Sequence, residues 1–123
     1  MNNRRRVLNN GSFNTSNYLT IEALADGLTV SFTNDLYYGI NGEGWELLTA
    51  GTTSPSINTG ETISFKAKIT PNSSSGSGTF TITGSCNLSG NCMSILYGDS
   101  AASNTNAPAY AFMSLFKNCS AIR

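Results

Sequence analysis

The sequence contains no histidine, and so lacks the side chain that proteins use most often as a general base and as a metal ligand. Any catalysis would have to use carboxylates, cysteine or lysine. The carboxylates are scattered over expected turns, where solvated acids are commoner than catalytic pairs, and no serine has a base partner. We therefore predict a protein that is not an enzyme, with no catalytic residue, no metal site and no cofactor.

Charged residues are also scarce, at 11% of 123 residues against about 25% in typical soluble domains. Seven basic and seven acidic residues cancel, so no overall field draws the chain to nucleic acid or to an acidic membrane. No run of residues is apolar and long enough for a transmembrane segment, and none near the N-terminus makes a signal peptide. We expect no nucleic-acid partner, no membrane insertion and no export by the ordinary route.

The cysteines are an odd number, Cys86, Cys92 and Cys119, so at least one is free or pairs between chains. Cys86 and Cys92 are close enough for a small disulfide loop if the chain turns at residues 89–91. Their spacing fits no zinc motif, and free cysteines that pack as small apolar side chains are the favoured alternative. The sequence leaves the state of this pair open.

Residues 1–17 are predicted to form an extended N-terminal arm. They show no strand or helix period, and their Asn, Ser and Gly content leaves too little apolar area to offset the entropy of ordering them alone. The arm would either be a solvated tail or carry anchors that bind a partner or dock on the domain itself. The candidate anchors are Arg4, Arg5, Arg6, Val7, Leu8 and Phe13.

Residues 18–107 carry the pattern of an antiparallel β domain. Apolar and polar residues alternate over 62–69 and 79–83, which predicts strands with one buried and one wet face. A polar loop between them predicts that they pair as a hairpin. We expect Ile63, Phe65, Ala67, Ile69, Phe80 and Ile82 on the buried face, and Ser64, Lys66 and Lys68 on the wet face.

Two further hairpins are predicted. Residues 19–21 are expected to pair with 28–32, and residues 36–40 with 45–48 through an Asn41-Gly42 turn, a dipeptide that tolerates the positive φ angles of tight turns. Strands every eight to twelve residues with glycine-rich turns favour an all-β fold, an antiparallel β-sandwich of the immunoglobulin-like or Greek-key type.

Residues 108–123 contain the first helical pattern of the chain. Pro108 suits a first helical turn, and Phe112, Leu115 and Phe116 fall on one face at three- and four-residue spacing. We expect a short amphipathic C-terminal helix over 108–118 that closes one end of the β core.

Three aromatic residues are candidates for a surface ligand platform. Tyr37, Tyr38 and Trp45 would bind a sugar or a peptide by stacking, and the alternative is a structural role in the sheet, with Trp45 covering the end of the core.

Several segments in one order resemble a known family. Residues 18–32, 48–66, 69–80 and 87–99 read YLTIEALADGLTVSF, LTAGTTSPSINTGETISFK, ITPNSSSGSGTF and NLSGNCMSILYGD. They resemble the N-terminal β domain of BspA-like leucine-rich-repeat proteins of Bacteroides and of its phages, including crAss-like phages. The resemblance covers about residues 18–123, and YAFMSLFKNC at 110–119 looks like the first helix of a truncated leucine-rich-repeat array.

This resemblance implies recognition or assembly, and it brings no catalytic residues. Together with the expected lack of an export signal, it favours a bacteriophage virion structural protein, as a capsid decoration, head-fibre or tail-associated protein. Such a protein would be anchored to other virion proteins by its arm, would form a homo-oligomer, and would display its β domain for adhesion to a host surface glycan or protein. It would be found in the virion, and in the host cytoplasm during assembly. The alternative is a Bacteroides cell-surface module that binds carbohydrate or protein.

Overall fold

The computed structural model describes residues 13–69, 78–103 and 115–116. These residues are mostly β, as predicted, and form seven strands in two antiparallel sheets together with short helical segments. The strands are β1 (Leu19–Ala23), β2 (Thr29–Phe32), β3 (Leu36–Ile40), β4 (Glu43–Leu48), β5 (Thr62–Lys66), β6 (Phe80–Thr83) and β7 (Cys86–Ser89). The helical segments are the 3₁₀ turn η1 (Thr15–Asn17), the α-helix α1 (Ser94–Tyr97) and the 3₁₀ helix η2 (Gly98–Ser103).

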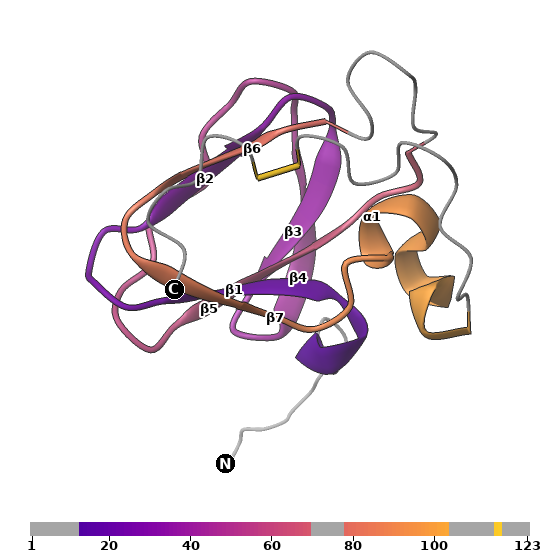
Figure 1. Ribbon diagram of the computed structural model, residues 1–123, viewed down its shortest axis with the longest axis horizontal. Coiled ribbons are helices and arrows are strands. Elements are labelled where there is room, and N and C mark those ends of the chain that lie inside the picture. Colours follow the sequence, from indigo (N-terminus) through magenta and orange to yellow (C-terminus); the bar gives the residue numbers. More distant parts are fainter. Residues whose placement is uncertain (1–12, 70–77, 104–114, 117–123) are drawn as a thin grey trace.

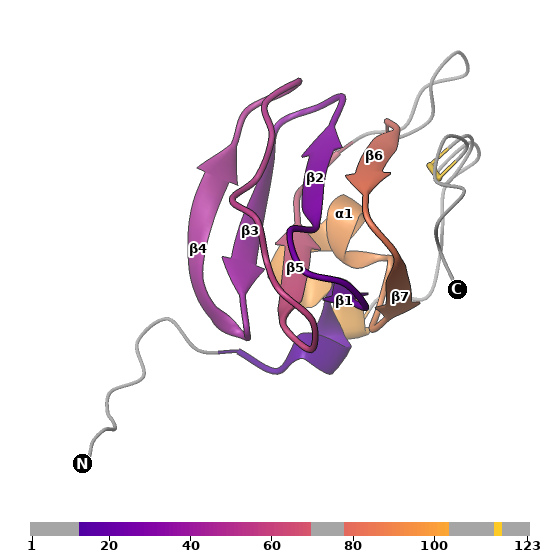
Figure 2. The ribbon, with the colours of Figure 1, turned by 90° about the vertical axis from the view of Figure 1, so that its left-hand side faces the viewer.

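The larger sheet has five strands in the order β4-β3-β5-β1-β7, and the smaller sheet pairs β2 with β6. Figure 1 shows the helical segment α1–η2 packed at one end of this arrangement, and Figure 2 shows β3 and β4 together on one side of the molecule and β6 and β7 on the other. The chain therefore moves between the two sheets several times, and most strand pairs join segments that are distant in sequence.

The hairpin formed by β3 and β4 confirms the prediction from Asn41-Gly42. Leu36 pairs with Leu48 and Tyr38 with Glu46, and a bulge follows Tyr38. Asn41 has φ 55° and Gly42 φ 75°, both in the left-handed region that a tight turn of this kind requires. The turn signal was local, and so it fixed this pairing.

The other two predicted hairpins are wrong. β1 pairs with β5 and β7, whereas β2 pairs with β6 in the smaller sheet, so residues 19–21 and 28–32 belong to different sheets. The same division separates β5 from β6. The buried faces of these strands agree with the prediction. The two strands of each predicted hairpin, however, face each other across the core instead of lying side by side in one sheet.

The core lies between the inner faces of the two sheets. Phe80 on β6 contacts Phe32 on β2 and Phe65 on β5, with ring centroids 4.3 and 5.1 Å apart. Of the residues predicted to be buried, Ile69 is half-buried, and the others are buried: Ile63, Phe65, Ala67, Phe80 and Ile82. Burying these apolar side chains away from water is the main force that holds the two sheets together.

Ser64 departs from its predicted wet position and is fully buried. Its hydroxyl lies 2.7 Å from the Thr20 hydroxyl, and Thr20 donates to the carbonyl oxygen of Thr15 in η1. The turn η1 therefore covers part of the outer face of the larger sheet. The buried hydroxyls are tolerated because each has a hydrogen-bond partner.

The domain begins earlier than the predicted boundary at residue 18. The amide of Phe13 donates to the carbonyl oxygen of Gly42 at 2.8 Å, and η1 is capped by Asn14, whose side chain accepts from the amide of Ser16. Residues 13–17 thus belong to the domain, because they make the local and long-range hydrogen bonds of a folded segment. Residues 1–12 of the predicted arm lie outside the described residues.

The helical segment α1–η2 precedes residues 108–123, where the first helical pattern of the chain was predicted. Asn91 forms a turn just before it: its side chain accepts from the amide of Met93, and its carbonyl oxygen accepts from the amide of Ser94. The predicted helix at 108–118 lies outside the described residues except for Leu115 and Phe116, which form a turn. Leu115 is buried, and Phe116 stacks on Phe80 with ring centroids 5.5 Å apart, so both cover the core as expected.

Cys86 is buried and Cys92 is half-buried, and no disulfide joins the two. This is the favoured of the two states that the sequence had left open, and Cys119 lies outside the described residues. Within the part of the chain that the structure describes, no helix is long and apolar enough to cross a membrane.

Candidate functional site

The outer face of the larger sheet carries a row of side chains that crosses three neighbouring strands. Leu47 on β4 pairs with Tyr37 on β3, and Tyr37 pairs on its other side with Lys66 on β5. Because successive residues of a strand point to opposite faces, this row lies on the face opposite the buried Leu36 and Phe65. Tyr37 is 45% exposed and Leu47 is 52% exposed, so two large apolar groups contact solvent here.

An aromatic cluster of Phe13, Tyr18 and Trp45 covers the neighbouring part of this face. Phe13 stacks on Trp45 with ring centroids 4.1 Å apart, and Tyr18 packs edge-on against Phe13 at 5.1 Å and against Trp45 at 4.9 Å. Gly39 makes room for the Phe13 ring, since a Cβ at this position would collide with it. The outer face is therefore covered beside Gly39 and open at Tyr37.

The segment α1–η2 brings Asp99 to the same face. Lys66 Nζ donates to both carboxylate oxygens of Asp99, at 3.0 and 3.2 Å, and lies 4.5 Å from the centroid of the Trp45 ring. The Tyr18 hydroxyl donates to Asp99 Oδ1 at 2.8 Å. The hydrogen bonds from Lys66 and then Tyr18 lower the pKa of Asp99. The Asp99 side chain is 70% exposed, so solvent screens the pair and it contributes less than about 1 kcal/mol to stability.

Beside this ion pair lies an open pocket of about 300 Å³, which we call the groove. The sheet supplies one side of it, and the start of η2 supplies the other. The residues that follow β5 connect the two sides. The groove is lined by Tyr37, Lys66, Ala67, Lys68, Gly98 and Asp99.

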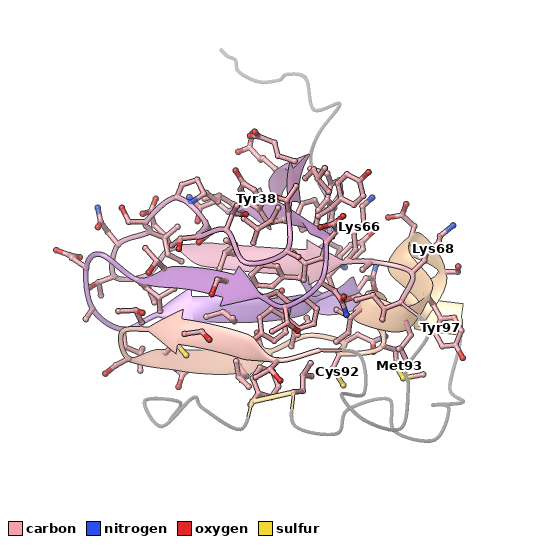
Figure 3. The ribbon with its side chains drawn as sticks, turned by 90° about the horizontal axis from the view of Figure 1, so that it is seen from above. Tyr38, Lys66, Lys68, Cys92, Met93 and Tyr97 are labelled. Atoms are coloured by element: carbon pink, nitrogen blue, oxygen red, sulfur yellow. The ribbon has the colours of Figure 1, made fainter. Side chains whose placement is uncertain are left out.

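Lys68 gives the groove an excess of positive charge. Its stem passes close to Gly98, where an added Cβ would lie 3.6 Å from Lys68 Cε. Figure 3 shows Lys66 and Lys68 both next to the helical segment that carries Tyr97. The charge of Lys68 also lowers the pKa of Asp99, but its ammonium makes no hydrogen bond or ion pair with another described residue.

The structure brings together only part of the predicted platform. Tyr37 and Trp45 lie on the outer face, but the Trp45 ring is covered by Phe13 and Lys66. Tyr38 lies on the inner face, where it is 9% exposed and belongs to the core. Burial raises its pKa, and the nearby charge of Glu46 adds to this. The platform of three rings is therefore wrong, because neighbouring residues of one strand face opposite ways, and Trp45 does not cover the end of the core.

The predicted anchors are only partly described. Phe13 docks on the domain itself, which is one of the alternatives that the sequence had left open. Arg4, Arg5, Arg6, Val7 and Leu8 lie outside the described residues.

Sequence reasoning missed Lys66, Lys68 and Asp99 as members of a site. The alternation over 62–69 predicts both lysines on the wet face, and the position of Asp99 in an expected turn predicts a solvated acid. Asp99 reaches Lys66 only because α1 returns the chain to the end of β5, where the amide of Ala67 donates to the carbonyl oxygen of Ser94. Asn91, a residue that favours turns, is the sequence signal for the change of direction just before α1.

The Tyr18 hydroxyl makes a pH-dependent contribution to stability. Burial first, and then the hydrogen bond to Asp99 and its charge, raise the pKa of Tyr18 from 10.0 to about 12. As the pH rises above the ordinary value, the unfolded chain loses this proton before the folded chain does. The stabilisation is complete below pH 10 and is lost as the pH approaches the folded value. We expect the advantage of the native protein over Tyr18→Phe in free energy of unfolding to fall by roughly 2 kcal/mol over this range.

Urea unfolding of both proteins at about pH 9 and at about pH 11.5 measures this change. Tyr38 is present in both proteins, so the difference between the two curves isolates Tyr18. Parallel losses in the two proteins would show that the Tyr18 hydroxyl is not held as described.

The described residues contain no group of three or more His, Cys, Asp or Glu side chains that could hold a metal ion. The groove instead combines one exposed aromatic ring with two lysines and one carboxylate, an arrangement suited to binding a polar ligand. Comparisons of this chain with protein-family models, with curated proteins and with solved structures find no match.

Proposed function

We propose that this chain is a non-enzymatic structural protein of a bacteriophage particle that displays its β domain for adhesion to the host surface. In this proposal it is a capsid decoration, head-fibre or tail-associated protein, and residues 1–12 attach it to other virion proteins. The resemblance to the β domain of BspA-like proteins of Bacteroides and its phages supports this assignment. The protein would occur in the virion, and in the host cytoplasm during assembly.

The observation that carries the adhesive part of this proposal is the open row of Leu47, Tyr37 and Lys66 beside the groove. Large apolar side chains that stay exposed next to a lined pocket are a common feature of interaction surfaces. The row is held on a paired sheet, so a ligand would meet side chains that are already in place. We propose in addition that the two sheets form a sandwich of the Greek-key or immunoglobulin-like type and that the protein is a homo-oligomer.

The same surface would serve a Bacteroides cell-surface module that binds carbohydrate or protein, which is the second candidate. The groove favours neither location, because contact with a host glycan from a particle and contact with an external glycan from a cell use the same chemistry. The two candidates differ in where the chain is found.

Quantitative mass spectrometry of purified phage particles from a Bacteroides lysate, compared with the host outer-membrane fraction, separates the two candidates. We expect peptides of this chain at a stoichiometric ratio to the major capsid protein in the particles. Peptides that occur only in the outer-membrane fraction would overturn the virion proposal and support the cell-surface module.

A further inference from the structure

We propose that the groove binds an acidic sugar unit, with its ring on Tyr37 and its anionic group at the ammonium of Lys68. This inference rests on the proposed adhesive function and names the class of ligand. Three observations carry it: the exposed ring, the charge balance of the groove, and the position of the lining strands inside the sheet.

The Tyr37 ring supplies a flat apolar surface. It is 45% exposed and stands between Leu47 and Lys66, its partners on the two neighbouring strands. The outer face also carries Trp45, but Phe13 stacks on that ring. Tyr37 is therefore the aromatic side chain of this face that a ligand meets, and the apolar face of a sugar ring packs on such a surface.

The charges of the groove favour an anion. Two lysines and one carboxylate line it, which leaves a net charge of +1. Lys66 and Asp99 are already joined by two hydrogen bonds, and Asp99 also accepts from Tyr18. The Lys68 ammonium makes no such bond within the described part of the chain, so it is the donor that remains for the anionic group of a ligand.

The position of the groove favours a sugar over an acidic peptide. An extended peptide commonly binds by adding a strand to a free sheet edge. The strands that line the groove, β3 and β5, lie inside the larger sheet, and each has paired neighbours on both sides. The groove also has about 300 Å³, the lower end of the range for small-molecule pockets. It therefore offers side chains and little free backbone, which suits a single sugar unit of a longer glycan.

Binding of the full-length, fluorescently labelled chain to an array of glycans tests this inference. The array carries uronate-containing, sialylated and sulfated glycans, each beside a neutral counterpart of the same backbone, together with poly-glutamate. We expect binding to one or more acidic glycans, at least tenfold above the neutral counterpart. The carboxylated and sulfated spots distinguish the two kinds of anionic group.

Variants then assign the binding to the groove. Lys68→Gln and Tyr37→Ala should each weaken the affinity for the best acidic glycan about tenfold. Two control variants should leave the affinity within about twofold. Lys68→Arg keeps the charge, and Leu24→Ala removes an exposed apolar residue outside the groove lining. All three positions are exposed, so the fold of the four variants can be checked by an unchanged melting temperature.

Three results would overturn the inference: no acidic glycan is bound, neutral glycans or poly-glutamate are bound as tightly, or Lys68→Gln leaves the affinity unchanged. These results are independent of location. A chain that is found in particles but binds no acidic glycan would overturn this inference alone, and a chain that binds acidic glycans but is absent from particles would overturn the virion proposal alone.

Discussion

Replacement of Phe80 with alanine should lower the free energy of unfolding by roughly 3 to 5 kcal/mol. Phe80 is fully buried, and its ring contacts Phe32 of its own sheet, Phe65 of the larger sheet and Phe116 near the C-terminal end of the described chain. Removal of the ring leaves a cavity at the place where these three segments meet, so both the transfer free energy of the ring and its packing contacts are lost. Domains of this size are stable by only about 5 to 15 kcal/mol, so this single change should remove a large share of the stability.

Chemical denaturation of the native protein, of Phe80→Ala and of Thr81→Ala measures this effect. Thr81 follows Phe80 on β6 and is exposed, and its replacement should change the stability by less than about 1 kcal/mol. A cost below about 1 kcal/mol for Phe80→Ala would mean that the buried and exposed faces of β6 had been exchanged. The ratio of the two costs therefore reports the orientation of the strand.

The faces of the strands were predictable from the sequence because a two-residue period is a local property. Phe65, Phe80 and Ile82 fall on the buried face that the alternation indicated. The outer face was misread at Ser64, because η1 folds over it from a segment whose composition resembles a tail.

The pairing of the strands was predictable only where a turn fixed it. Asn41-Gly42 joins neighbouring strands and gave the correct hairpin. One partner of β1 is β5, which follows it by about forty residues: Ile21 pairs with Ile63. No local pattern distinguishes such a partner from a nearer strand of the same period, so nearest-neighbour pairing was assumed and failed.

The sequence also did not show which side chains the fold brings together in the groove. The alternation placed Lys66 on the exposed face, but its ion pair with Asp99 joins residues 33 positions apart and depends on the turn at Asn91. Similarly, Tyr37 and Tyr38 looked equivalent in the sequence, and the sheet separates them onto opposite faces. The types of residue that make a binding surface were visible in the sequence, whereas their assembly required the tertiary fold.

Replacement of Gly90 with alanine should lower the free energy of unfolding by roughly 2 to 4 kcal/mol, although the residue is exposed and lies outside the core. Gly90 has φ +80°, where a side chain is strained. A Cβ here would also collide with the carbonyl oxygen of Tyr18 and come within 2.9 Å of that of Thr15. Both obstacles are backbone atoms, and the Tyr18 carbonyl oxygen also accepts a hydrogen bond from the amide of Asn91, so neither can move aside without separating the two segments.

Gly51→Ala is the matched control for this effect. Gly51 has the same φ of +80°, and nothing lies within 4 Å of the position of an added Cβ, so its replacement should cost only the backbone strain of about 1 to 2 kcal/mol. The excess cost at Gly90 therefore measures the contact between the end of β7 and the segment of η1 and Tyr18.

The same replacement should also change the titration of Asp99. Because the hydroxyl of Tyr18 holds Asp99 beside the groove, Gly90→Ala should raise the pKa of Asp99 towards its ordinary value, which Gly51→Ala should not do. Equal stability losses in the two variants, with an unchanged titration of Asp99 by NMR, would contradict the close approach of Gly90 to Tyr18.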